Sequence, residues 1–278
     1  MLGPGRIART ARLCDSASMN VTNARPELTA LPPPALAERT GPLKVRPGVV
    51  HVWALALEGP EDCIAWCRQR LTDDERARAD RFFFERHRNE YVIAHGLLRH
   101  LLARYCDTDP LELAFDSGPS GKPILRTQPA GKPPVSFNLS HSHGRALLAV
   151  SDGRDVGIDI EWIDRRTDVL ALARRYFFGS ERREIENAPP HATRETFFRY
   201  WVAKEAVLKA QGVGLRFPLS LFEIRFAADG RTATVASSDP SRLSPDWTVR
   251  MLTCEPGWMG AVAAAGEDWQ VEIMSGAS

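Results

Sequence analysis

Residues 156–162 read Val-Gly-Ile-Asp-Ile-Glu-Trp, and the rest of the chain can be interpreted from this stretch. Apolar residues alternate with Gly157, Asp159 and Glu161, which is the period of a β-strand with one apolar face. The two carboxylates therefore lie on one face, with Cα atoms about 6.5–7 Å apart, and can converge on one hard cation. An ordinary strand with a solvated acidic face fits these seven residues equally well.

A second stretch, residues 198–209, favours the cation site. At about 100° per residue it predicts a helix with one apolar stripe. The stripe consists of Phe198, Trp201, Val202 and Leu208. Glu205 and Lys209 fall within about 20° of Phe198, inside the stripe. A solvated Glu–Lys pair four residues apart is the alternative, but a pair centred on a core-facing stripe has to line a cleft or lose its water.

Composition bounds the class of protein. The chain has 278 residues, 44% of them hydrophobic, which is enough for one large core or two smaller ones. A net charge of +1 gives no general attraction to nucleic acid or membrane. Five cysteines without a C-x-x-C pair or zinc spacing fit a reducing compartment, and no apolar run approaches the roughly 20 residues that span a bilayer. We expect a cytoplasmic monomer that binds neither nucleic acid nor membrane.

Three segments are expected along the chain. Residues 1–47 are rich in Pro, Arg, Ala and Thr without an apolar period, which predicts a disordered N-terminal extension. Its basic start resembles a targeting peptide, and a translation start at Met19 is the alternative. Residues 48–152 and 153–278 each run strand, helices, strands. This order predicts an α+β fold of two similar subdomains, helices packed on antiparallel sheet, with the active site at their interface.

The expected elements follow from periodicity and punctuation. Helices are expected at 61–70, 88–105, 169–178, 180–187 and 193–211, and Thr72 with Glu75 forms a capping box that opens one more. Strands are expected at 49–55, 123–125, 135–139, 146–150, 156–162, 222–226, 232–236, 248–253, 259–264 and 270–273.

The polar residues indicate phosphoryl chemistry. Asp159, Glu161 and Glu205 form an all-oxygen set that suits Mg²⁺. Positive charge for phosphate oxygens would come from Lys209, Lys204, His141 and Lys122. His141 and His143 have no third ligand at a recognisable spacing, so a transition-metal site is not favoured. The P-loop and Rossmann motifs are both missing from the sequence.

Four motifs in register carry a resemblance over residues 49–274. They are Gly121-Lys122-Pro123, Phe137-Asn138-Leu139-Ser140-His141-Ser142, Gly157-Ile158-Asp159-Ile160-Glu161 and Trp201-x-x-Lys204-Glu205-Ala206-x-x-Lys209. In this order the chain resembles the 4'-phosphopantetheinyl transferases of the surfactin-synthetase-activating type. The resemblance implies transfer of the phosphopantetheine arm of coenzyme A to a serine of an apo acyl or peptidyl carrier protein, as in polyketide and nonribosomal peptide biosynthesis, with release of adenosine 3',5'-bisphosphate.

The resemblance also implies roles for single residues. Asp159, Glu161 and Glu205 would hold Mg²⁺ on the coenzyme pyrophosphate. Lys122, Pro123, Ser140 and His141 would line the nucleotide, and this family too has two similar α+β halves with the site between them. Glu205 would take the serine proton, directly or through a metal-bound water, and Lys209 or Lys204 would stabilise the departing bisphosphate. We count His141 with Glu205 and Lys209 as catalytic.

One position departs from the family pattern. Many relatives carry an Arg that grips the 3'-phosphate of the coenzyme where this chain has Glu90. We expect Arg86 or Arg88 to substitute for it. Two other functions stay open on the sequence alone: a silent module that binds coenzyme A or a carrier protein, and a different Mg²⁺-dependent phosphoryl-transfer enzyme.

Overall fold

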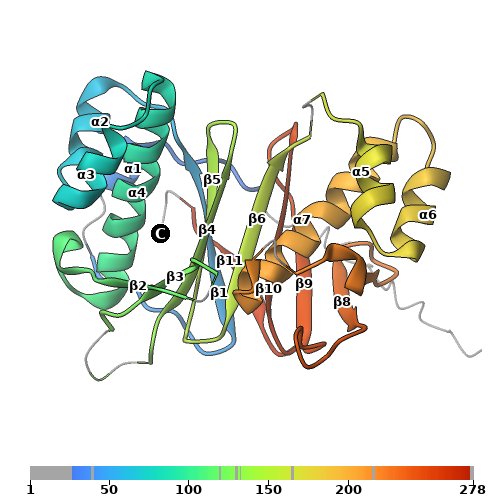
Figure 1. Ribbon diagram of the computed structural model, residues 1–278. Helices are drawn as coiled ribbons and strands as arrows, with labels where there is room; N and C mark the ends of the chain where they lie inside the picture. Colours follow the sequence, from blue (N-terminus) through green and yellow to red (C-terminus); the bar gives the residue numbers. More distant parts are fainter. Residues whose placement is uncertain are drawn as a thin grey trace, which may run out of the picture.

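The fold is mixed α+β, which confirms the predicted class (Figure 1). The computed structural model describes residues 27–275 except 39–40, 119, 129–130, 132, 164–165 and 215–216. Helices α1–α4 flank one side of the strands and α5–α7 flank the other, and the strands form the middle of the molecule. None of the helices within these ranges is long and apolar enough to cross a bilayer.

The first sheet has four strands in the order β11-β1-β5-β4. These strands are β11 (Gln270–Ile273), β1 (Val49–Ala56), β5 (Arg145–Ser151) and β4 (Ser136–Ser142). Four helices belong to the same half: α1 (Pro33–Ala37), α2 (Glu61–Arg68), α3 (Asp73–Ala79) and α4 (Glu85–Cys106). A turn at η1 (Pro110–Glu112) leads to a small hairpin of β2 (Phe115–Ser117) and β3 (Pro123–Leu125). The predicted capping box opens α3, because Thr72 N–H donates to Glu75 Oε2 at 2.9 Å.

The second sheet has five antiparallel strands in the order β6-β10-β9-β8-β7. They are β6 (Val156–Trp162), β10 (Trp258–Ala265), β9 (Trp247–Leu252), β8 (Thr232–Ser237) and β7 (Phe222–Phe226), which follows η3 (Leu219–Leu221). Its helices are α5 (Val169–Tyr176), α6 (Gly179–Asn187) and α7 (Thr193–Gln211). Helix α7 ends where Gly212 takes a left-handed conformation, φ 73°, as the sequence predicts.

Three apolar clusters fill the molecule and explain the layering. The first lies between α1–α4 and the first sheet, where Trp53 and Leu55 of β1 point. The second lies between α5–α7 and the second sheet. The third lies between the two sheets, where Val52 of β1 meets Ile158 of β6. Both faces of β1, β5, β6 and β10 are therefore covered, whereas β7 and β8 at the far edge of the second sheet bury only one face.

The prediction of a disordered extension over residues 1–47 is wrong for the part that the structure describes. Leu28 forms a bridge with Cys254, and Leu31 pairs with Leu55 at the end of β1. Leu36 of α1 is fully buried in the first cluster. The leucines of this segment reach the core singly, without the helical or strand period that predicts burial. Residues 1–26, with the basic start and Met19, lie outside the described residues.

The last strand crosses from one half to the other. Strand β11 belongs to the predicted segment 153–278, yet it pairs in parallel with β1, and Val49 faces Gln270. The boundary at residue 152 remains a prediction, and β11 is an exception to any simple division there.

Candidate active site

Helix α7 lies directly on β6, and Gly157 makes this approach possible. A Cβ atom at position 157 would lie 2.1 Å from the carbonyl oxygen of Ala206 and 2.2 Å from the nitrogen of Ala210. These atoms belong to backbone and cannot rotate away, so only glycine fits. The acidic face of β6 is therefore covered by α7. The alternative of a solvated acidic face is excluded.

Asp159 is buried at the centre of this contact, with 4% of its surface exposed. Its Oδ1 accepts hydrogen bonds from Ser140 Oγ at 2.9 Å and from Lys209 Nζ at 2.6 Å. Lys209 also donates to Ser140 Oγ at 2.8 Å. Burial raises the pKa of Asp159, and the neighbouring Lys209 opposes that shift. Oδ2 of Asp159 is buried and has no hydrogen-bond partner among the described residues.

Glu205 faces the same centre from α7 and is 8% exposed. Burial raises its pKa to about 7, and the charge of Asp159 adds to the shift. Its Oε1 is also buried without a hydrogen-bond partner in the described part of the chain. Two nearby carboxylates that each have one buried oxygen without a hydrogen-bond donor would be stabilised by a bound cation.

Strand β4 supports β6 through a row of polar side chains, of which the sequence predicted a role only for Ser140. Asn138 Oδ1 accepts the Ile158 N–H at 2.8 Å. Ser142 Oγ donates to Glu161 Oε2 at 3.1 Å. With Ser140 between them, these alternate residues bridge the edge strands of the two sheets. The spacing of two between residues 138, 140 and 142 predicts that they share one face of the strand. In the structure this face lies against β6, and Ser140 contacts Asp159.

The acidic set fits a divalent cation by its chemistry. Asp159 and Glu205 each present a buried, unpartnered oxygen, and Mg²⁺ prefers carboxylate oxygens. Glu161 interacts electrostatically with both carboxylates. Within the described residues no three acidic, His or Cys side chains are already close enough to hold a metal. Lys209 instead provides the positive charge at Asp159.

His141 points to the opposite face of β4, toward α4. Partial burial and the charge of Lys209 lower its pKa, whereas Glu90 of α4 raises it. Arg86 Nε pairs with Glu90 Oε1 at 2.8 Å. Arg88 instead pairs with Glu85 at 3.3 Å. Of the two predicted arginines, Arg86 is therefore the one that pairs with Glu90, whose charge raises the pKa of His141.

Lys122 ties the β3 hairpin to the second half of the molecule. Its Nζ donates to the carbonyl oxygens of Val156 at 2.9 Å and Ala210 at 3.2 Å, the first residue of β6 and the last turn of α7. Burial lowers its pKa. Lys122 and the neighbouring Pro123 line a cavity of about 430 Å³ that reaches Gly212. The lysine thus lies near the site, but its ammonium group is bonded to backbone.

The prediction for Lys204 is wrong in its placement. Lys204 is fully buried on another side of α7, where its Nζ pairs with Glu181 Oε1 at 2.9 Å. The Nζ also donates to the carbonyl oxygens of Leu219 and Phe222. Successive helix residues point about 100° apart, so Lys204 leaves the face that Glu205 and Lys209 share. Lys209 is the lysine beside the acidic set.

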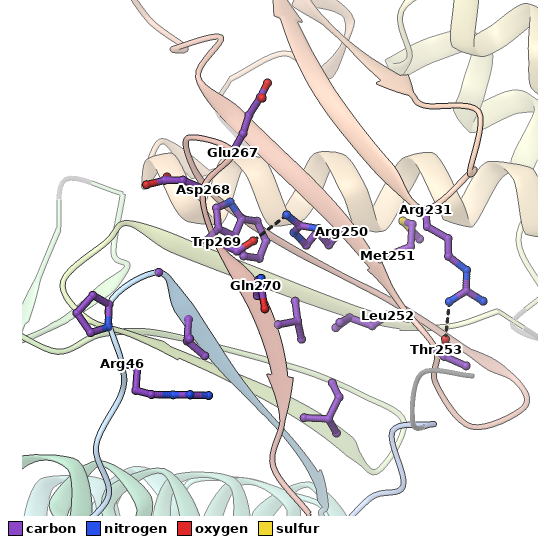
Figure 2. Close-up of a pocket in the computed structure, with 15 residues that line it drawn as sticks. Arg46, Arg231, Arg250, Met251, Leu252, Thr253, Glu267, Asp268, Trp269 and Gln270 are labelled. Atoms are coloured by element: carbon purple, nitrogen blue, oxygen red, sulfur yellow. Dashed lines mark hydrogen bonds between the residues drawn. The ribbon is translucent and has the colours of Figure 1, made fainter. Parts of the chain in front are cut away.

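A cavity of about 930 Å³ lies elsewhere, between β11 and the end of β9 (Figure 2). Arg46, Arg231 and Arg250 line it together with Glu267 and Asp268. None of the predicted site residues lines it.

Fold and site together define a class: a two-sheet α+β protein with a buried acidic centre between an edge strand and a helix. The model of the 4'-phosphopantetheinyl transferase superfamily matches residues 155–261. The model of the N-terminal region of 4'-phosphopantetheinyl transferase matches residues 61–152. The chain belongs to the 4'-phosphopantetheinyl transferase superfamily, and the predicted resemblance is confirmed.

Curated relatives cover most of the chain. The 4'-phosphopantetheinyl transferase HetI of Nostoc sp. is 37% identical over 223 residues, which is 80% of this chain and 90% of the relative. The 4'-phosphopantetheinyl transferase Sfp of Bacillus subtilis is 28% identical over 73% of this chain and 86% of its own length. The 4'-phosphopantetheinyl transferase psf-1 of Bacillus pumilus is 34% identical, over 73% and 83%.

Proposed function

We propose that this transferase moves the phosphopantetheine arm of coenzyme A onto a serine of an apo acyl or peptidyl carrier protein and releases adenosine 3',5'-bisphosphate. Membership of the family supports the reaction. The single structural observation that carries the proposal is the pair of buried carboxylates, Asp159 and Glu205, each with one unpartnered oxygen, beside Lys209. We further propose that the enzyme acts as a cytoplasmic monomer in polyketide or nonribosomal peptide biosynthesis.

Glu205 is suited to the role of general base. In the metal-free protein burial raises its pKa to about 7, and a bound cation would favour the ionised carboxylate, which is the form that can accept a proton. The serine oxygen attacks the β-phosphorus of coenzyme A, its proton passes to Glu205, and the bond from the β-phosphorus to the bridging oxygen breaks. Electrons of that bond leave with adenosine 3',5'-bisphosphate. Lys209, which pairs with Asp159, would stabilise the charge on the leaving phosphate.

Asp159, Glu161 and Glu205 are the residues that would hold Mg²⁺. When bound, Mg²⁺ would neutralise pyrophosphate charge. Ser140 orients Asp159 and Lys209 at once, because its hydroxyl donates to the carboxylate and accepts from the ammonium group. His141, whose neutral ring can donate a hydrogen bond, and Arg86, whose guanidinium would exchange its ion pair with Glu90 for the phosphate, are the groups of β4 and α4 that we propose for the 3'-phosphate of the coenzyme.

One assay separates the proposed function from the two alternatives. Apo carrier protein is incubated with coenzyme A, Mg²⁺ and the enzyme, and the carrier is analysed by intact mass spectrometry. Addition of one phosphopantetheine arm supports the transferase. An unchanged carrier with intact coenzyme A would indicate a silent binding module, and cleavage of coenzyme A without an adduct would indicate another phosphoryl-transfer enzyme. Asp159→Asn, which keeps the size of the side chain, should abolish the adduct.

A further inference from the structure

The buried ion pair between Lys204 and Glu181 plays no part in the chemistry described above. Lys204 has none of its surface exposed and Glu181 has 1%. A buried ion pair commonly stabilises a fold no better than apolar side chains of the same volume, because both charges lose their water. A contribution to overall stability therefore does not explain why this pair is present. Its geometry suggests instead that it holds neighbouring elements in a fixed orientation.

Every donor and acceptor of the pair is engaged. The ammonium group of Lys204 has three N–H bonds, and they go to Glu181 Oε1 at 2.9 Å, Leu219 O at 2.8 Å and Phe222 O at 2.5 Å. Glu181 also accepts the backbone N–H of Ile224 on Oε1 at 2.8 Å and that of Phe178 on Oε2 at 3.0 Å. The pair thus joins α7 to the start of α6, to η3 and to β7 through five polar contacts.

The ion pair includes Lys204, the residue next to Glu205 in the chain. Lys204 precedes Glu205 on α7, and their side chains point about 100° apart. On its other side α7 touches β6 at Gly157, where the two backbones leave no space for a Cβ atom. Helix α7 is therefore held from both sides at the level of Glu205. A small rotation of α7 would move the Glu205 carboxylate relative to Asp159.

A rotation of α7 would disturb the two carboxylates at this contact. Asp159 and Glu205 are both buried, and each has one oxygen without a hydrogen-bond partner among the described residues. The hydrogen bonds of Lys209 go to Asp159 and Ser140, so they do not fix the position of Glu205.

We propose that the Lys204–Glu181 pair is a positioning device that fixes the rotation of α7 and so holds the Glu205 carboxylate beside Asp159 for a shared divalent cation. This inference rests on the proposed function for the identity of the cation site. Lys204 and Glu181 do not touch substrate or metal; they act through Glu205.

The test measures cation binding as well as turnover. Mn²⁺ serves as the probe and is titrated by electron paramagnetic resonance in the presence of coenzyme A. The double variant Lys204→Met/Glu181→Gln removes both charges and nearly keeps the volume. We expect its Mn²⁺ affinity to fall about tenfold or more, as for other residues that orient metal ligands. We also expect kcat to fall while the KM for the carrier protein changes less than about twofold.

A second variant and a control make the result decisive. Glu181→Asp keeps the charge but shortens the side chain by one methylene, and it should weaken Mn²⁺ binding in the same direction if the double variant does not fold. Ile185→Ala is the matched control, because Ile185 is fully buried in the same helix and cluster and its side chain has no polar atom that could hydrogen-bond to the pair. It should lower the melting temperature and leave Mn²⁺ affinity unchanged.

The inference fails if the folded double variant, or Glu181→Asp, binds Mn²⁺ with the affinity of the wild type. It also fails if Ile185→Ala weakens Mn²⁺ binding as much as they do, since destabilisation alone would then explain the loss. A wild-type protein that binds Mn²⁺ through Asp159 but forms no carrier adduct would contradict the proposed function and leave the positioning role intact.

Discussion

At the scale of single residues, the acidic centre joins a strand to a helix: Lys209 of α7 pairs with Asp159 of β6 at 2.6 Å, and Glu205 of α7 interacts with both. The strand period puts Asp159 and Glu161 on one face of the strand, and the helix period puts Glu205 and Lys209 on one face of the helix, so this centre could be predicted from the sequence. The helix period also turns Lys204 about 100° away from Glu205. Its partner Glu181 could not be predicted, because α7 is buried on nearly all sides and its period does not tell which neighbour covers each face.

The raised pKa of Glu205 predicts a pH dependence of stability. Its pKa is about 7 in the folded protein and 4.5 in an unperturbed carboxyl group, so the unfolded state loses the proton first as pH rises. The contribution of Glu205 to the free energy of unfolding is therefore full below pH 4.5 and is lost toward pH 7. A shift of this size is worth on the order of 3 kcal/mol.

Urea denaturation of the metal-free protein between pH 4.5 and 7.5 measures this effect. The Glu205→Gln variant should show a flatter decline in the free energy of unfolding than the wild type over this range. Added Mg²⁺ should also flatten the wild-type decline, since a cation favours the ionised carboxylate. Identical slopes for the wild type and Glu205→Gln without metal would show that Glu205 titrates normally.

Gly157 allows a direct test of the contact between β6 and α7. In Gly157→Ala the new methyl group would meet backbone atoms of Ala206 and Ala210 at little more than 2 Å. We expect a loss of about 3 kcal/mol or more in the free energy of unfolding, at or above the upper range for overpacking. Gly41→Ala is the matched control, because a Cβ atom at Gly41 meets nothing within 4 Å. Equal stability of the two variants would mean that α7 does not approach β6 this closely.

At the scale of elements, local patterns predicted most helices and strands, and the segment before β1 was the main failure. Helices α5, α6 and α7 and strands β6 to β11 lie at the predicted positions within a few residues. Their periods are long enough to be recognised. Residues 27–38 instead make isolated contacts, such as the hydrogen bond from Leu31 N–H to Ala54 O at 2.9 Å. Such contacts leave no periodic pattern in the sequence, so they could not be predicted from it.

Truncation measures what this segment contributes. A chain that starts at Pro47 loses the buried side chains of Leu28 and Leu36 and the bridge of Leu31 to β1. Burying one leucine is worth about 1.5–3 kcal/mol, so we expect a loss of several kcal/mol in unfolding free energy, or insoluble protein. A chain that starts at Glu27 keeps these contacts and is the control. If both truncated chains melt at the same temperature, the packing of residues 27–46 contributes nothing.

At the scale of the whole molecule, the sequence predicted two α+β halves but not how they are joined. The parallel pairing of Val49 with Gln270 links residues more than two hundred positions apart, and local periodicity carries no information on such partners. The cluster between the two sheets likewise combines residues of β1 and β5 with residues of β6 and β10. The site reflects this junction, because β4 comes from the first half and β6 with α7 from the second.

The position of the site at this junction predicts that one half carries the chemistry and the other binds the 3'-phosphate. Kinetics with coenzyme A can test this prediction. The groups proposed for the chemistry, Asp159, Glu205 and Lys209, lie on β6 and α7. The groups proposed for the 3'-phosphate, His141 and Arg86, lie on β4 and α4. Removing a group of the second kind should therefore change substrate binding and leave the chemical step nearly intact.

Arg86→Ala and Arg88→Ala form a matched pair on the first turn of α4. Arg86 is held by Glu90, whose charge acts on His141, whereas Arg88 is held by Glu85. One charge-assisted contact to phosphate is worth roughly 1.5–3 kcal/mol. Arg86→Ala should therefore raise the KM for coenzyme A about ten- to a hundredfold with little change in kcat or in the KM for 3'-dephospho-coenzyme A, and Arg88→Ala should change none of these. A wild-type enzyme that uses both coenzymes with equal KM would show that the contact is absent. A preference for coenzyme A that survives Arg86→Ala would assign the 3'-phosphate to another cation near His141.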